Sequence, residues 1–179
     1  MPPERLIRKI GPGDFRIIGN EFFHHFVTKG GLRPDAHVLD VGCGCGRMAI
    51  PLTRYLTSGS YEGFDASRVL VAWCQDNITP NYPNFRFQHV DVLNQAYNSS
   101  GKIRPSELRF PYGDGSFDFV FLCSVFTHML ALDLEHYISE ITRVLKDEGT
   151  SFITFFLLNA ESEQLLTEKR SSEKFLQVS

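Results

Sequence analysis

Residues 38–47 read VLDVGCGCGR, an apolar strand that runs straight into a turn with three alternating glycines. Gly42, Gly44 and Gly46 allow a sharp backbone turn, and they let a ligand approach the main chain where a Cβ would collide. We expect a helix at about residues 46–57, with Pro51 near its first turn, because a missing N–H costs least there. A helix amino terminus favours an anionic group. The stretch therefore predicts a strand–turn–helix unit that binds a nucleotide-type ligand.

The spacing of the glycines argues against two common nucleotide sites. A dinucleotide fingerprint reads G-x-G-x-x-G, but Arg47 occupies its third glycine position and the last glycine comes one residue early. No G-x-x-x-x-G-K-[ST] P-loop occurs in the chain. The chain also contains no reductase-type Tyr-x-x-x-Lys. A nicotinamide-dependent oxidoreductase is therefore only a minor alternative.

The composition is that of one ordinary globular domain. The chain has 179 residues, of which 42% are hydrophobic and 22% charged, with a net charge of −3. Because this balance is slightly acidic, we expect neither nucleic acid nor an anionic membrane as a partner. The first residues lack the apolar core of a signal peptide, and no apolar run approaches about 18 residues. We therefore expect a cytoplasmic protein with reduced cysteines.

Cys43 and Cys45 form a C-x-C pair inside the glycine turn. A closed zinc site needs two more ligands, and no second cysteine pair or histidine pair at zinc spacing accompanies it. The simpler interpretation is that both cysteines are small residues that fit a tight turn. We expect no metal.

Strand and helix patterns alternate from residue 36 to 159, which predicts a doubly wound, mostly parallel α/β sheet covered on both faces. The expected strands are 37–41, 61–64, 85–90, 117–123 and about 151–157. Apolar faces predict a helix ahead of the sheet, with residues 15, 18, 22 and 26, and one after the fourth strand, with residues 134, 138, 141 and 145. Gly30 and Gly31 end the first of these helices, and Ser67 caps a helix that reaches Ile78. Residues 94–110 form a long loop, of the kind that serves as a lid, a binding segment or a disordered region.

Five segments occur in the order and at the spacing of one known family. Residues 38–47 read acid-x-G-x-G-x-G, Asp65 closes the second strand, and Asp91 closes the third. Residues 110–118 (FPYGDGSFD) lead into the fourth strand, and residues 141–149 (ITRVLKDEG) precede the fifth. Together these segments resemble class I S-adenosylmethionine-dependent methyltransferases of the bacterial small-molecule type.

The resemblance implies a Rossmann-like fold, S-adenosylmethionine as the cofactor and S-adenosylhomocysteine as its product. Asp65 would accept hydrogen bonds from the ribose hydroxyls. Asp91 and its neighbour Val92 would meet the adenine, and Asp40 would orient the turn and meet the methionine ammonium. The three turn glycines would give access to the backbone.

The methyl acceptor would be a small molecule held beside the fourth strand. His128 follows that strand, and its ordinary pKa near 6.5 suits a general base, although a capping or packing role is the alternative. Phe15, Tyr97 and Phe126 are candidates for an aromatic wall against the acceptor or the sulfonium. The alternative for each of the three aromatic residues is a place in the core.

The sheet of this family normally has seven strands and ends in an antiparallel hairpin, but only five can be placed here. We expect residues 1–159 to form the cofactor-binding domain and residues 160–179 a polar tail, in a truncated or naturally short chain. The fifth strand would then be an exposed edge, so we expect partner coverage, a homodimer or aggregation at residues 151–158. A non-catalytic binding or scaffold module is the alternative function.

Overall fold

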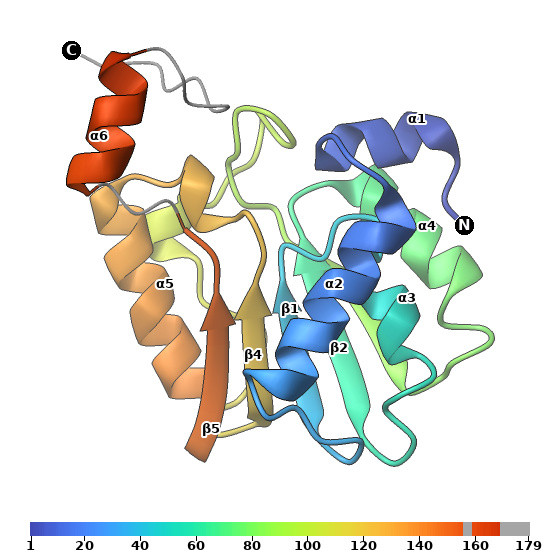
Figure 1. The fold of residues 1–179 in the computed structure, drawn as a ribbon. Coiled ribbons are helices and arrows are strands. Elements are labelled where there is room, and N and C mark those ends of the chain that lie inside the picture. Colours follow the sequence, from blue (N-terminus) through green and yellow to red (C-terminus); the bar gives the residue numbers. More distant parts are fainter. Residues whose placement is uncertain (156–158, 169–179) are drawn as a thin grey trace.

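The computed structural model describes residues 1–155 and 159–168, and within them the strands form one parallel sheet (Figure 1). The strand order is β3-β2-β1-β4-β5. The strands are β1 His37–Val41, β2 Ser60–Asp65, β3 Phe85–His89, β4 Phe117–Leu122 and β5 Leu145–Ile153. The predicted doubly wound α/β fold with five strands is therefore confirmed for the described residues.

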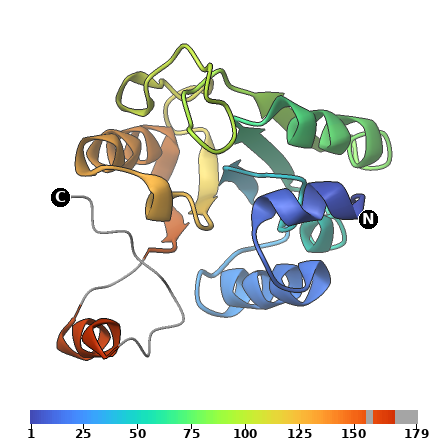
Figure 2. The same cartoon turned by 90° about the horizontal axis from the view of Figure 1, so that it is seen from above.

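Helices cover both faces of the sheet (Figure 2). The α-helices are α1 Glu4–Ile7, α2 Phe15–Thr28, α3 Ala49–Leu52, α4 Arg68–Asn77, α5 Ala131–Val144 and α6 Ala160–Thr167. Short 3₁₀ helices are η1 Arg8–Ile10, η2 Pro105–Glu107 and η3 Phe126–His128. One core lies between the sheet and α2, α3 and α4, and a second lies between the sheet and α5. A small third cluster joins Leu6 of α1, Phe15 of α2, Cys45 of the glycine turn and Leu70 of α4.

β1 belongs to both cores because successive side chains of a strand point to opposite faces. Val38 packs on the side of α2, and Leu39 packs on the side of α5, each with no exposed surface. The helix predicted ahead of the sheet is confirmed as α2, and Phe26 on its apolar face is fully buried. Asp14 caps that helix, since its carboxylate accepts hydrogen bonds from two backbone N–H groups of the first turn.

The long connection after β3 is ordered and contributes to the core. Two β-bridges and the helix η2 shape it. Leu108 and Phe110 are buried against α5. Residues 108–110 therefore pack under α5, whereas the sequence predicts a lid, a binding segment or disorder for the whole range 94–110.

The buried face of α5 differs from the predicted one. Ile138 is 45% exposed, whereas Tyr137 and Glu140 are buried. Glu140 tolerates burial because its carboxylate accepts hydrogen bonds from Arg143 and from the backbone N–H of Phe110, at 2.6 and 2.7 Å. The predicted apolar face at 134, 138, 141 and 145 is therefore wrong at residue 138, and residue 145 lies in β5, beyond the end of the helix.

β5 begins at Leu145, six residues before the predicted strand at about 151–157. Leu145 pairs with Phe117 and Thr150 pairs with Phe119, so the four residues between them bulge out of the ladder. Glu148 lies in this bulge with a φ of 65°. Ile153 ends β5, so residues 154–155 of the predicted strand are not part of it, and residues 156–157 lie outside the described residues. β5 is an edge of the described sheet, as predicted.

Candidate functional site

The glycine turn lies at the carboxyl ends of the parallel strands, the upper edge of the sheet in Figure 1. β1, β2 and β4 are neighbours and end at Val41, Asp65 and Leu122. Open α/β sheets bind their ligands at this edge, where the strand order reverses. The structure therefore brings two predicted site residues, Asp40 and Asp65, to the same edge.

The glycines of the turn are required by backbone conformation and by packing. Their φ angles are 85° at Gly42, 53° at Gly44 and 78° at Gly46. A Cβ on Gly44 would lie 2.9 Å from Cγ2 of Ile10, and one on Gly42 would lie 2.6 Å from Cγ2 of Val125. Protein side chains therefore occupy the positions at which the sequence predicts the approach of a ligand.

The backbone N–H groups of the turn bind acceptors within the protein. Gly42 and Cys43 both donate to the carbonyl oxygen of Phe64, at 2.9 and 3.0 Å. Gly46 donates to the carbonyl oxygen of Cys43 at 3.0 Å. These bonds fix the turn against β2 and engage all three donors within the protein.

The helix after the turn is shorter than the predicted 46–57. α3 covers only Ala49–Leu52. Pro51 has no N–H to donate to the preceding turn, and the positive φ of Gly46 is not helical. Because four residues align few peptide dipoles, the predicted attraction of an anion to a helix amino terminus has little basis here.

Asp65 connects the glycine turn to the start of α4. Its Oδ2 accepts from the N–H of Gly44 at 2.8 Å, and its Oδ1 accepts from the N–H of Ser67 at 2.7 Å. Burial raises the pKa of this carboxyl, and the two N–H groups oppose that rise. Ser67 is the predicted N-cap residue, but its side chain makes no capping hydrogen bond to the described helix. A carboxylate has about four lone-pair positions, so Asp65 can still accept two further hydrogen bonds.

Asp40 is buried within β1, with 2% of its surface exposed. Its Oδ2 accepts a hydrogen bond of 2.5 Å from the Tyr61 hydroxyl. Burial raises the pKa of Asp40 to about 8, the Tyr61 hydrogen bond lowers it, and the charge of Asp65 raises it further. The carboxyl is therefore mostly protonated at neutral pH, and its predicted contact with an ammonium stays a prediction.

Arg47 follows the last turn glycine, and its side chain is partly buried. One terminal guanidinium nitrogen donates to the carbonyl oxygen of Ile10 at 2.7 Å, and the guanidinium carbon lies 6.0 Å from the ring centre of Phe15. Its Nε is buried and has no hydrogen-bond partner among the described residues. No role for this residue follows from the sequence, in which the one indication is a bulky cation directly after the turn.

Asp91 lies two residues beyond β3, which ends at His89. Its Oδ1 accepts from the side-chain amide of Asn98 at 3.0 Å, a partner that the sequence does not predict. Val92 is buried in the core beneath α5. The roles of Asp91 and Val92 toward an adenine stay predictions.

The three predicted aromatic residues differ in exposure. Phe15 and Phe126 are 5% and 7% exposed, so packing accounts for both. Tyr97 is 38% exposed, so it is the one of the three whose side chain remains accessible to a ligand.

The segment after β4 carries the predicted base. Ser124 has a φ of 61°, which is uncommon outside glycine, and its N–H donates to the hydroxyl of Thr154 at 2.9 Å. The helix η3 follows and ends at His128. The backbone thus holds residue 128 near the carboxyl edge, but the side chain of His128 lies outside the described part of the chain.

Cys43 and Cys45 are both buried. Burial raises the pKa of the Cys45 thiol to about 11 and that of Cys43 well above its usual range. Among the residues that the structure describes, no group of three histidine, cysteine, aspartate or glutamate side chains could hold a metal ion.

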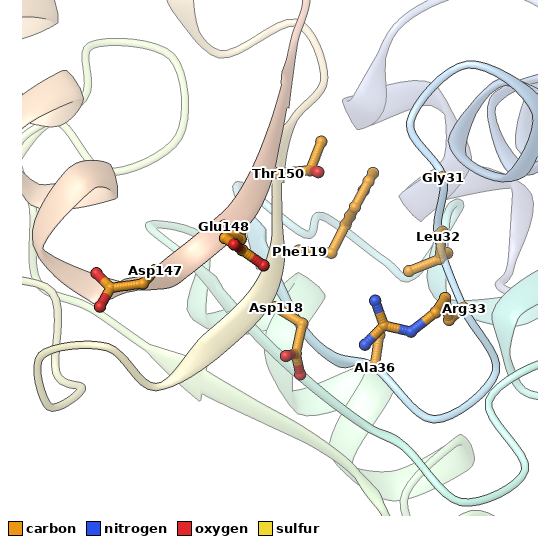
Figure 3. A pocket seen from close by; sticks show the side chains of 10 residues that line it. Gly31, Leu32, Arg33, Ala36, Asp118, Phe119, Asp147, Glu148 and Thr150 are labelled. Atoms are coloured by element: carbon orange, nitrogen blue, oxygen red, sulfur yellow. The ribbon is translucent and has the colours of Figure 1, made fainter.

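A polar hollow of about 220 Å³ lies at the opposite edge of the sheet (Figure 3). Ala36, just before β1, and Asp118, near the start of β4, both line it, together with Glu148 of the β5 bulge. Because these residues mark the amino ends of β1 and β4, the hollow is separate from the glycine turn.

Comparisons with known proteins show which family and which proteins this chain resembles. A family model described as a methyltransferase domain matches residues 38–149. Sterol 24-C-methyltransferase erg6 of Schizosaccharomyces pombe is 24% identical over 147 residues, which are 82% of this chain and 35% of that protein. The chain thus spans about a third of the length of this relative.

Two solved structures show the same fold. A TehB-like SAM-dependent methyltransferase from Corynebacterium glutamicum has a TM-score of 0.54 and 19% identity, over 82% of this chain and 70% of that one. The [4+2]-cyclase SpnF has a TM-score of 0.57 and 24% identity, over 77% of this chain and 44% of that one.

The helices of the described residues are all too short or too polar to span a lipid bilayer.

Proposed function

The chain belongs to the family of methyltransferase domains, and we propose that it transfers a methyl group from S-adenosylmethionine to a small-molecule acceptor. The family and the fold predicted from the sequence are confirmed by the match over residues 38–149 and by the fold neighbours. The predicted cofactor is supported by the same family match and by the SAM-dependent methyltransferase among those neighbours.

The observation that carries this proposal is the position of Asp65. Its carboxylate lies at the end of β2, is held by the N–H groups of Gly44 and Ser67, and keeps two lone-pair positions for further donors. The two hydroxyls of a ribose need such acceptors, and a carboxylate provides them with charge-assisted bonds. Because the N–H of Gly44 is hydrogen-bonded to the carboxylate of Asp65, the turn and the acid form one preorganised unit.

When bound, S-adenosylmethionine supplies a methyl group that is already activated on a sulfonium. The residues of this chain then mainly have to align the acceptor and exclude water, and alignment alone can contribute about 7–11 kcal/mol. An acceptor hydroxyl or ammonium needs a group that takes its proton, and we assign this role to His128. Tyr97, which is partly exposed, would form the aromatic wall, because Phe15 and Phe126 are buried in the core.

The acceptor is proposed to be a small molecule and not a nucleic acid. The net charge of −3 gives no general attraction to phosphate backbones. The relative from Schizosaccharomyces pombe is named for a sterol acceptor. We therefore expect an uncharged or weakly charged small molecule, chosen by the segments that surround the carboxyl edge.

Calorimetric titration of S-adenosylhomocysteine tests the cofactor site. We expect micromolar binding to the wild type and a loss of about 10- to 100-fold in Asp65→Asn, because the neutral amide weakens the bonds to the ribose and its NH2 group cannot accept from the second of the two N–H donors, Gly44 and Ser67. Asp76→Asn, an exposed acid on α4, is the matched control and should bind like the wild type. A folded wild type that binds no S-adenosylhomocysteine would refute the proposal.

A binding module without methyl transfer is the second candidate. One fold neighbour is named as a [4+2]-cyclase, so the fold alone does not specify methyl transfer. This candidate predicts binding of S-adenosylhomocysteine but no release of it from S-adenosylmethionine with any acceptor in a broad panel. A nicotinamide cofactor should raise the melting temperature under neither candidate.

A further inference from the structure

The methionine end of S-adenosylmethionine carries a carboxylate, and the glycine turn offers it few donors. The N–H groups of Gly42, Gly44 and Gly46 all donate to acceptors within the protein. α3 has only four residues, so it adds little positive potential. A bound carboxylate is therefore best held by a cationic side chain near the turn.

Arg47 is placed to be that side chain, because separate segments of the chain converge on it. The carbonyl oxygen of Ile10 in η1 accepts a hydrogen bond from the guanidinium, and the ring centre of Phe15 in α2 lies 6.0 Å from the guanidinium carbon. Arg47 directly follows Gly46, and Asp65 is hydrogen-bonded to Gly44 of the same turn. The turn thus carries one group for each end of an extended nucleoside–amino acid ligand.

The hydrogen bonding of Arg47 is incomplete. Its Nε is buried without a partner, and no carboxylate in the described residues lies within ion-pair distance of it. Arg143 shows the contrast, since it is also partly buried but pairs with Glu140 at 2.6 Å and with Asp114 at 2.8 Å. A buried donor without a partner is costly, and the group that best satisfies a guanidinium is a carboxylate.

We propose that Arg47 binds the methionine carboxylate of the cofactor, with its unpartnered Nε as one of the two donors. This inference rests on the proposed function, and it adds a residue that distinguishes a complete cofactor from a nucleoside. The bond from Arg47 to Ile10 holds the amino-terminal segment against Gly44 at the same time. Arg47 would therefore bind the carboxylate and, through Ile10, also hold the amino-terminal segment that packs against the turn.

The test compares two ligands that differ only in the carboxylate, S-adenosylhomocysteine and its decarboxylated analogue, by calorimetric titration. The wild type should bind S-adenosylhomocysteine about 10- to 100-fold more tightly. Arg47→Met should lose most of this preference, by weakening S-adenosylhomocysteine while changing the analogue by less than about twofold. Arg68→Met removes an exposed arginine from the first turn of α4 and should keep the preference.

Each other outcome overturns the inference in a recognisable way. Equal losses for both ligands in Arg47→Met would mean that the residue acts only through its bond to Ile10. A wild type without preference would refute the inference even if the variant failed to fold, and would leave the proposed function intact. A wild type that bound neither ligand would refute both.

Discussion

Asp40→Asn should remove the contribution of Asp40 to the pH dependence of stability between pH 5 and 7. The pKa of Asp40 is raised by burial to about 8 in the folded protein, against about 3.9 in an unfolded chain. The folded state therefore holds this proton more tightly than the unfolded state does. The resulting stabilisation is complete below pH 4 and is lost as the pH rises toward 8.

The magnitude follows from the two pKa values. Between pH 5 and 7 the wild type should lose about 2.5 kcal/mol of unfolding free energy through Asp40, and a folded pKa one unit lower reduces this by only about 0.3 kcal/mol. Cys43, Cys74 and Cys123 also interact with Asp40, but the pKa of each thiol is raised, so none titrates in this range. Asp65 is unchanged in Asp40→Asn, so its titration contributes to the stability curves of both the wild type and the variant.

Urea unfolding at pH 5, 6 and 7 measures this difference directly. The amide introduced by Asp40→Asn keeps an oxygen that accepts from the Tyr61 hydroxyl, so the substitution removes the titration and keeps the hydrogen bond. We expect the curve of wild-type stability to fall toward that of Asp40→Asn as the pH rises. Parallel stability profiles for the two proteins would refute the reasoning, because Asp40 would then be ionised in both states.

Three further results are expected. Gly42→Ala should destabilise the protein by about 1–3 kcal/mol in urea unfolding, and Gly11→Ala should destabilise it less. Both glycines have a positive φ, but of the two only Gly42 has a described atom, Cγ2 of Val125, within 3 Å of the position of an added Cβ. Glu140→Gln should cost about 2–4 kcal/mol, because it removes the charge that pairs with Arg143; a loss below about 1 kcal/mol would mean that solvent screens the pair. Light scattering should show a dimer or larger species at high concentration through the edge of β5, and a monomer at every concentration would contradict that expectation.

Much of the fold can be predicted because the central strands are apolar on both faces. Phe121 and Leu39 are fully buried on strands whose sequences are nearly continuous apolar runs. The face of α5 is less predictable, since a pattern of apolar residues cannot show that Glu140 is satisfied by Arg143 and therefore buried. The length of α3 also depends on local geometry, the positive φ of Gly46 before Pro51.

The site is predictable where its residues follow strand ends and unpredictable where partners come from elsewhere. Asp65 lies at the end of β2, a position that the order of strands and turns fixes. Tyr61 is 21 residues from Asp40, and Ile10 is 37 residues from Arg47. Nothing in the local pattern joins either pair, because both contacts arise only when distant segments pack together.

The strand order also sets a sequence of events during synthesis. On one side β1 pairs with β2, which emerges from the ribosome soon afterwards, as the contact between His37 and Ser60 spans 23 residues. On its other side β1 waits for β4, and the contact between His37 and Asp118 spans 81 residues. A nascent chain therefore carries an open edge of β1 until residues 117–122 have been made, and a chaperone that shields this edge would act before β4 appears.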